Sequence, residues 1–196
     1  MRKYAKTLKY YVQRIDMPKV RVKYVTSALR EHHDRILEAV ALLDKILSSP
    51  SPDPEAVRFL IQFIQRFVDQ CHHSIEEYIL FQGVNRQGFP YLGSPIHVMT
   101  SEHGVGRYLS RVMEELYTAW REGDQNALKD LFDYARLYID HISDHILKEN
   151  NVLFPMLESS YAEVSASKTV EEIERENQHE YWISKLEELK SKWSAH

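Results

Sequence analysis

One pattern, His-x-x-x-Glu-x-x-x-Leu-Phe, occurs twice in this chain and restricts its possible folds more than any other feature. The two copies span residues 72–81 and 145–154, with identical offsets. On an α-helix, residues four apart lie on the same face. Each copy therefore predicts a helix that turns one imidazole and one carboxylate to the same side, one turn before a pair of apolar residues.

The first copy contains a competing pair, because His73 and Glu77 are also four residues apart. Relative to the Leu-Phe that ends the first copy, His73 and Glu77 are shifted by one residue from the positions of the histidine and glutamate in the second copy. His72 and Glu76 occupy the same positions as in the second copy. Adjacent residues of an α-helix project about 100° apart. The repeat therefore favours His72 and Glu76 as the inward pair, and it places His73 and Glu77 at the surface or around the inward residues.

The composition and the positions of the glycines and prolines predict long helices. The 196 residues include six glycines and seven prolines, and apolar residues recur at spacings of three and four between the breaks. Asp53, Ser94, Asp124 and Thr169 stand where helices are expected to begin, and Thr169 with Glu172 matches a capping box. These signals predict five helices, at about residues 20–47, 54–83, 95–121, 125–154 and 169–193.

Four long helices with short connections predict an all-α fold, an antiparallel up-down-up-down four-helix bundle over residues 20–157. Residues 1–19 are interpreted as an N-terminal extension, and residues 158–196 as a polar linker and an additional C-terminal helix. The apolar residues of that last helix either pack on the bundle or offer a surface to a partner. They are Trp182, Ile183, Leu186 and Leu189.

Histidines on the other two helices stand at the depth of the repeat. The first helix carries His32 and His33, and the third carries His103. Counted from the predicted helix ends at about 1.5 Å per residue, His33 and His103 fall within about 5 Å of the level of the repeat histidines. The step to the next apolar residue favours His33 over His32 as the inward residue. His141 stays open as a further ligand, because it lies four residues before His145.

Imidazoles and carboxylates gathered at one level of a bundle are typical ligands of borderline transition metals. Two His-Glu pairs with a histidine from each remaining helix suit two ions, chiefly iron and then manganese or zinc. The single cysteine, Cys71, excludes a multi-thiolate zinc site and is expected to be structural. The other histidines, His97, His179 and His196, are expected at the surface or around the ligands. The residues expected to wall the metal cavity are Leu80, Phe81, Leu153 and Phe154.

Several other classes are disfavoured. A ferritin-like centre needs two Glu-x-x-His motifs, and this chain has one, from Glu176 to His179, while the His-Glu-x-x-His of zinc proteases is absent. The net charge of −4 gives no reason to expect nucleic acid or an anionic membrane as a partner. No signal peptide is recognised, and no apolar run approaches the roughly 18 residues that span a bilayer, so we expect a cytoplasmic protein.

Four motifs occur in order over residues 22–157, namely "EHHDRI", "HHSIEEYILF", "PIHVMTSEHGVGR" and "HILKENNVLFP". Together they resemble the hemerythrin-like family, the HHE cation-binding domain. The resemblance implies a four-helix bundle that holds a non-haem di-iron centre. The ligands that it implies are His33, His72, Glu76, His103, His145 and Glu149.

The chain departs from oxygen-carrying hemerythrins at one ligand. Those proteins have a second histidine four residues after the third-helix ligand, and Arg107 stands there in this chain. The residue directly after that ligand is often acidic in relatives, and here it is Gly104. The resulting set of four histidines and two carboxylates is more similar to the branch that repairs iron–sulfur clusters.

The resemblance also implies a function. Two iron ions, joined by an oxo or hydroxo bridge, would leave one open position for O₂, NO or peroxide, in stress response or the repair of iron centres. The alternative is a non-catalytic iron, oxygen or redox sensor that acts through a protein partner or as a homodimer. Whether the protein is an enzyme stays open at this point.

Overall fold

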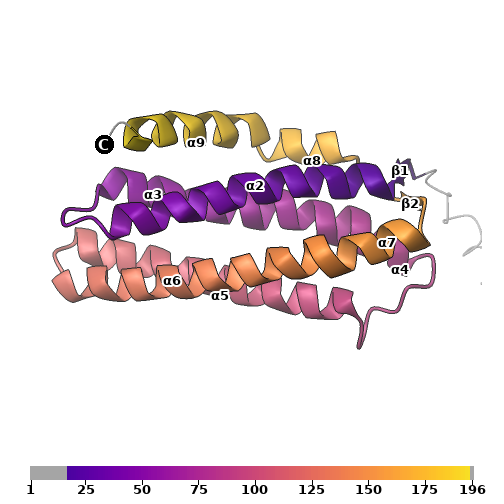
Figure 1. Ribbon diagram of the computed structural model, residues 1–196, viewed down its shortest axis with the longest axis horizontal. Coiled ribbons are helices and arrows are strands. Elements are labelled where there is room, and N and C mark those ends of the chain that lie inside the picture. Colours follow the sequence, from indigo (N-terminus) through magenta and orange to yellow (C-terminus); the bar gives the residue numbers. More distant parts are fainter. Residues whose placement is uncertain (1–16, 195–196) are drawn as a thin grey trace, which may run out of the picture.

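The computed structural model describes residues 17–194, and helices account for most of them (Figure 1). The all-α prediction is confirmed. The predicted N-terminal extension falls almost wholly outside the described residues, as does His196. The long helical segments are α2 (Val22–Leu47), then α3 (Pro54–Phe63), η2 (Ile64–His72), η3 (Ile75–Phe81) and α4 (Gln82–Asn85), then α5 (Pro95–Arg121), and finally α6 (Gln125–Lys148), η4 (Glu149–Leu153) and α7 (Phe154–Ser160).

The predicted start signals explain where these segments begin. The Asp53 carboxylate accepts hydrogen bonds from the first amides of α3, at 3.0 and 3.4 Å, and the Asp124 carboxylate accepts one at the start of α6, at 2.9 Å. Both side chains satisfy amides that a helix leaves free at its N-terminus. Ser94 precedes α5 as expected, but its hydroxyl donates to the Tyr91 carbonyl at 2.7 Å and does not cap the helix.

The four long segments lie side by side along the longest axis of the molecule (Figure 1). α2 contacts both α3 and α6, and α5 contacts the same two helices, so the segments close a ring. The connections at residues 48–53, 86–94 and 122–124 are short, and each one reverses the chain. Every segment therefore turns one face to a common interior.

Two apolar clusters fill this interior and leave a polar layer between them. In α2, Ile36 belongs to the first cluster and Leu29 to the second, and two histidines stand between them. In the second segment Val68 and Ile75 flank the layer in the same way. The buried polar side chains thus cross the interior at a single level, with apolar packing above and below.

Two short strands and two further helices complete the described chain. β1 (Lys19–Arg21) pairs antiparallel with β2 (Glu163–Ser165), with Val20 opposite Val164. The segment expected as a polar linker therefore contains a strand, which ties the start of α2 to the end of α7. α8 (Val170–Glu176) and α9 (His179–Ser194) run along the outside, next to α2 and the second segment (Figure 1). Among the described helices, none combines the length and apolar character needed to cross a membrane.

The predicted continuous helix over 169–193 is wrong at its centre. The capping box of Thr169 and Glu172 starts α8 as expected, but the helix ends at Glu176 and restarts at His179. Gln178 adopts the left-handed conformation, with φ of 57°, and this conformation commonly ends a helix. Leu186 is buried and the other apolar residues of α9 pack against the first cluster, so packing on the bundle, the first of the two readings, is confirmed.

A matched pair of glycines tests how closely β2 packs against α4. A Cβ atom on Gly83 of α4 would lie 2.6 Å from the Val164 Cβ of β2, whereas one on Gly104 of α5 would meet nothing within 4 Å. We expect Gly83→Ala to lower the free energy of unfolding by about 1–3 kcal/mol through overpacking. Gly104→Ala should raise it by about 0.5–1 kcal/mol through helix propensity. Urea denaturation of the metal-free variants measures both changes, and equal effects would contradict the close approach of β2.

Candidate metal centre

The structure brings all six sequence-predicted ligands together in the polar layer. α2 supplies His33, the second segment His72 and Glu76, α5 His103, and the last segment His145 and Glu149. Each of these side chains is buried. The choice of the inward histidine in α2 agrees with the structure, because His32 turns toward α8 and α9.

His73 is expected at the surface or around the ligands, and the structure excludes the surface, because the side chain lies in the layer. The side chain is 1% exposed, and its ring stacks on the His103 ring with centroids 3.8 Å apart. The cause is local: the residues before and after it form the π-helical turns η2 and η3. A π turn holds more residues than an α turn, with i→i+5 hydrogen bonds, so neighbouring side chains diverge by less than 100°. His72 and His73 therefore both reach the interior, while Val68, Ile75 and Ile79 stay buried.

The donors form two adjacent groups that share one carboxylate, and the ligand atoms of each group lie within 4.8 Å of one another. The two-histidine half consists of His33, His72, Glu76 and Glu149, and the three-histidine half of His73, His103, His145 and Glu76. Glu149 also spans both halves, because Oε2 lies 3.1 Å from His33 Nε2 and Oε1 lies 3.2 Å from His145 Nε2.

Most of these donor atoms contact one another as His–Glu pairs, but none forms a hydrogen bond among the described residues. The Nε2 atoms of all five histidines and both oxygens of Glu76 and Glu149 are buried without a hydrogen bond to any described residue. Leaving so many polar atoms unsatisfied in an apolar interior is costly unless something binds them. The polar layer therefore has the chemistry of a metal site.

The spacing of the donors fits a bound ion. Two donors that bind one ion at about 2.1 Å, at right angles to each other, lie about 3.0 Å apart. Glu76 Oε2 lies 3.2 Å from His103 Nε2 and 3.6 Å from His72 Nε2, and the Glu149 contacts are of similar length. The side chains are thus arranged around two positions, with the carboxylates between them.

Carboxylates hold the rings in place from behind. His103 Nδ1 donates to Glu77 at 2.8 Å, and His145 Nδ1 donates to Glu102 at 2.9 Å. Such carboxylate–histidine pairs fix the tautomer and turn Nε2 toward the metal. His33 Nδ1 lies 3.0 Å from the Asn150 amide oxygen, and His73 Nδ1 lies 3.3 Å from Asp69.

Arg107, at the position where the sequence departs from oxygen-carrying hemerythrins, supports a ligand indirectly. Its guanidinium donates to Glu77 at 2.7 Å, and Glu77 in turn orients His103. His73, from the second segment, brings a further imidazole into the three-histidine half. The donor set therefore contains five imidazoles, although the motif alone indicates four.

The electrostatics of the metal-free layer are dominated by one charge pair. Burial disfavours charge on His145, but Glu149 and the hydrogen bond to Glu102 outweigh it and raise the pKa of His145 to about 10. Burial and the neighbouring charge of Glu149 raise the pKa of Glu76 to about 7. Burial and the nearby imidazoles hold the pKa values of His72 and His73 well below the usual range. Those two imidazoles are neutral and ready to bind an ion.

The other residues singled out in the sequence lie around the layer or away from it. His141 donates from Nε2 to the Glu102 carbonyl at 2.9 Å, so that nitrogen is occupied. His97 is exposed. Cys71 is buried, and burial raises the pKa of its thiol to about 12, which fits a structural role. The residues expected to wall the cavity are all buried, with Phe154 stacked on His33 and Phe81 on His103.

Sequence reasoning missed three supporting residues, Asp69, Glu102 and Asn150. Asp69 lies four residues before His73 and Glu102 directly before His103. If both His72 and His73 are expected to face inward, the spacing of four residues between Asp69 and His73 predicts that the carboxylate supports the ring. The contact from Glu102 to His145 joins two helices, so only the packed structure shows it.

The fold and this layer define a helical protein with a buried histidine–carboxylate site for metal. Residues 25–157 match the family model described as hemerythrin HHE cation binding domain, more than half of the chain. The chain belongs to this family. Similar proteins include the iron-sulfur cluster repair protein YtfE of Yersinia pestis (strain Pestoides F) and of Yersinia pseudotuberculosis (serotype O:1b, strain IP 31758). Each is 27% identical over 139 residues, which is 68% of this chain and 63% of the relative. The chain thus spans less than two thirds of the length of these relatives.

Substituting His73 tests its place in the donor set. We expect His73→Ala to keep the ion of the two-histidine half and to weaken binding in the three-histidine half by at least about 100-fold, since a direct ligand matters more than a residue that orients one. Metal content after equilibrium dialysis should fall from two ions per chain toward one. His97→Ala is the control and should keep both ions, and a His73→Ala protein with two ions held at unchanged affinity would contradict the assignment.

Metal loading should release protons at neutral pH. With a pKa of about 10, His145 is protonated at pH 7 in the metal-free protein, and a metal ligand must be neutral. Adding Zn²⁺ to metal-free protein at pH 7 should release at least one proton per chain, and the apparent affinity should rise as the pH rises. A titration in weak buffer with a pH indicator measures the release, and His145→Gln should release about one proton fewer. Metal uptake without proton release would contradict the charged state of His145.

Proposed function

We propose that the polar layer holds two iron ions and that the protein acts in the repair of iron centres, through the reaction of this centre with O₂, NO or peroxide or by giving up iron. The four long segments would serve as an antiparallel bundle around the centre. The observation that carries the proposal is the unpartnered donor set, five imidazole nitrogens and four carboxylate oxygens grouped around two positions.

The number of donors favours two ions over one. Both Glu76 and Glu149 touch histidines of each half, as bridging carboxylates do. With both carboxylates counted, each position has two or three imidazoles and two oxygens within reach. Mixed nitrogen and oxygen donors suit iron, and manganese or zinc are the less favoured alternatives.

The protein's contribution is placement and exclusion of water. The two-histidine half has one imidazole fewer than the three-histidine half, so an ion there keeps more room for an added ligand. Phe154 stacks on His33, with ring centroids 5.6 Å apart, and this apolar neighbour shields that half from water. When bound, the iron pair supplies a redox-active site for a small oxidant or for NO.

The repair role rests on the relatives. Those similar proteins are named for iron–sulfur cluster repair, and this chain is 27% identical to them over 139 residues. The alternative, a sensor that signals through a protein partner, has less support, because the apolar residues of α9 that were considered for a partner are packed against the molecule itself.

The test combines metal analysis with a repair assay. Protein purified without oxygen should contain close to two irons per chain, and the iron-loaded form should restore a [4Fe–4S] enzyme that peroxide has inactivated. His72→Gln should lose at least one iron and slow the repair at least about tenfold, whereas exposed His97→Gln should behave as wild type. Native protein with one zinc and no iron would overturn the di-iron proposal. Two irons without any repair would overturn the repair role and favour the sensor.

A further inference from the structure

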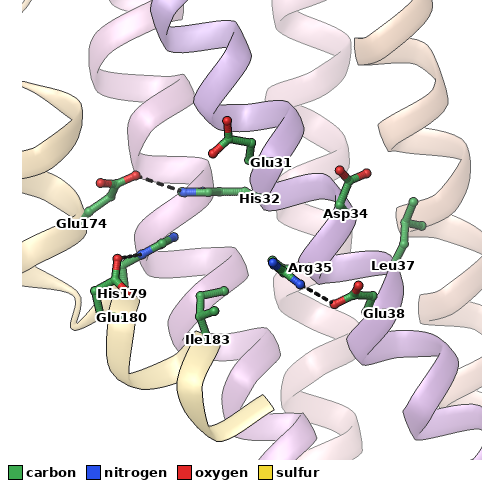
Figure 2. Close-up of a pocket in the computed structure, with 10 residues that line it drawn as sticks. All are labelled: Glu31, His32, Asp34, Arg35, Leu37, Glu38, Glu174, His179, Glu180 and Ile183. Carbon is green, nitrogen blue, oxygen red and sulfur yellow. Dashed lines mark hydrogen bonds and ion pairs between the residues drawn. The ribbon is translucent and has the colours of Figure 1, made fainter. Parts of the chain in front are cut away.

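A second group of metal-binding side chains lies outside the buried centre, on the wall of a surface pocket. The pocket has a volume of about 670 Å³ between α2 and the α8–α9 pair (Figure 2). Three of its side chains are His32, Glu174 and His179, whose ligand atoms lie within 4.8 Å of one another. His32 Nε2 lies 3.2 Å from Glu174 Oε1, and the rings of His32 and His179 stack with centroids 4.8 Å apart.

We propose that these three residues form a third metal site, for one divalent transition ion, through which iron passes between the pocket and the buried centre. Two imidazoles with one carboxylate are a familiar donor set for Zn²⁺ and Fe²⁺. Three protein ligands leave further positions open, and here they face a pocket with room for water or a small chelating molecule. The part of the proposal that concerns iron transfer rests on the proposed function.

The break between α8 and α9 is what brings the donors together. In a continuous α-helix, residues 174 and 179 would point about 140° apart. Gln178, in the left-handed conformation, interrupts the helix between them, so that both side chains turn to His32. A non-glycine residue in this sparsely populated conformation is often found where a ligand site requires it.

A hydrogen-bonded pair of His32 and Glu174 alone leaves two features unexplained, the buried second nitrogen of His32 and the nearby His179 ring. His32 is 2% exposed, and its Nδ1 has no hydrogen-bond partner among the described residues. The His179 ring adds a second nitrogen donor beside the same carboxylate. Within the part of the chain that the structure describes, its one ionic contact runs from Nδ1 to the exposed Glu180 at 3.4 Å, a distance long enough for an ion to replace it.

The charge at the pocket favours cations. Carboxylates outnumber the single guanidinium in its lining, which contains Glu31, Asp34, Glu38, Glu174 and Glu180 against Arg35. That guanidinium is itself paired with two carboxylates, on Glu38 and Glu187. A pocket lined by one sign of charge raises the local concentration of the opposite ion.

His32 connects this site to the buried centre without any intervening residue. It precedes His33 in the chain, and its ring centroid lies 5.7 Å from that of His72. Both of these neighbours belong to the two-histidine half, which has fewer imidazoles. An ion bound by His32 and Glu174 is therefore next to the half of the centre that has fewer imidazoles.

The test measures a third ion and the rate of iron release separately. Protein with its two buried irons is titrated with Co²⁺ without oxygen, and optical absorption reports binding. Wild type should bind one further ion, while Glu174→Gln and His179→Gln should lose this binding and keep both irons. His97→Gln, which changes a histidine outside both sites, should bind Co²⁺ as wild type does.

The second measurement follows transfer of iron to a strong external chelator. Release should be at least fivefold slower in His179→Gln than in wild type or His97→Gln, at equal iron content and equal melting temperature. Undiminished Co²⁺ binding in the two pocket variants would overturn the third site. Lost Co²⁺ binding with unchanged release would overturn its role in transfer. Absence of iron from the buried centre of wild type would refute the proposed function instead, and the Co²⁺ titration would still decide on the third site.

Discussion

The structure depends on the burial of nine donor atoms that have no hydrogen-bond partner within residues 17–194. Five imidazole nitrogens and four carboxylate oxygens meet at one level of the interior, where desolvation of each would oppose folding. The apolar clusters on both sides contain most of the buried side chains. Their burial stabilises the fold enough to offset the desolvation cost of the polar layer. The same clusters keep water away, so the donors have little to bind except an ion.

The orienting contacts turn this layer into a defined site. Glu77, Glu102 and Asn150 each hold one ring from behind. These residues are themselves held, Glu77 by Arg107 and Glu102 by Lys148. The network extends from the ligands to the partly exposed surface of the helices, so contacts from other segments fix the direction of Nε2 in His33, His103 and His145.

The repeat carried most of what could be predicted from the sequence. It selected His72, Glu76, His145 and Glu149, and depth counting added His33 and His103, all of which the structure brings together. It did not place His73 among the inward residues, because an α-helical step of about 100° turns that side chain away, and the chain forms π turns there. Such turns depend on packing across the interior, where the side chains of four segments compete for space. The β1–β2 pair was missed for a similar reason, since it joins residues that are distant in sequence.

The pairing of β1 with β2 has a consequence for the order of events during synthesis. Lys19 and Glu163 are 144 residues apart, and His33 and Asn150 are 117 apart. Contacts of such separation form late, because the intervening chain must first be placed. When a ribosome has made only the first two long segments, α2 and α3 to α4, the emerged chain contains His33, His72, His73 and Glu76. It does not yet contain Glu149 or strand β2, which pairs with β1. The nascent chain therefore presents an incomplete and weakly binding donor set, and tight capture of metal begins only when almost the entire domain has emerged.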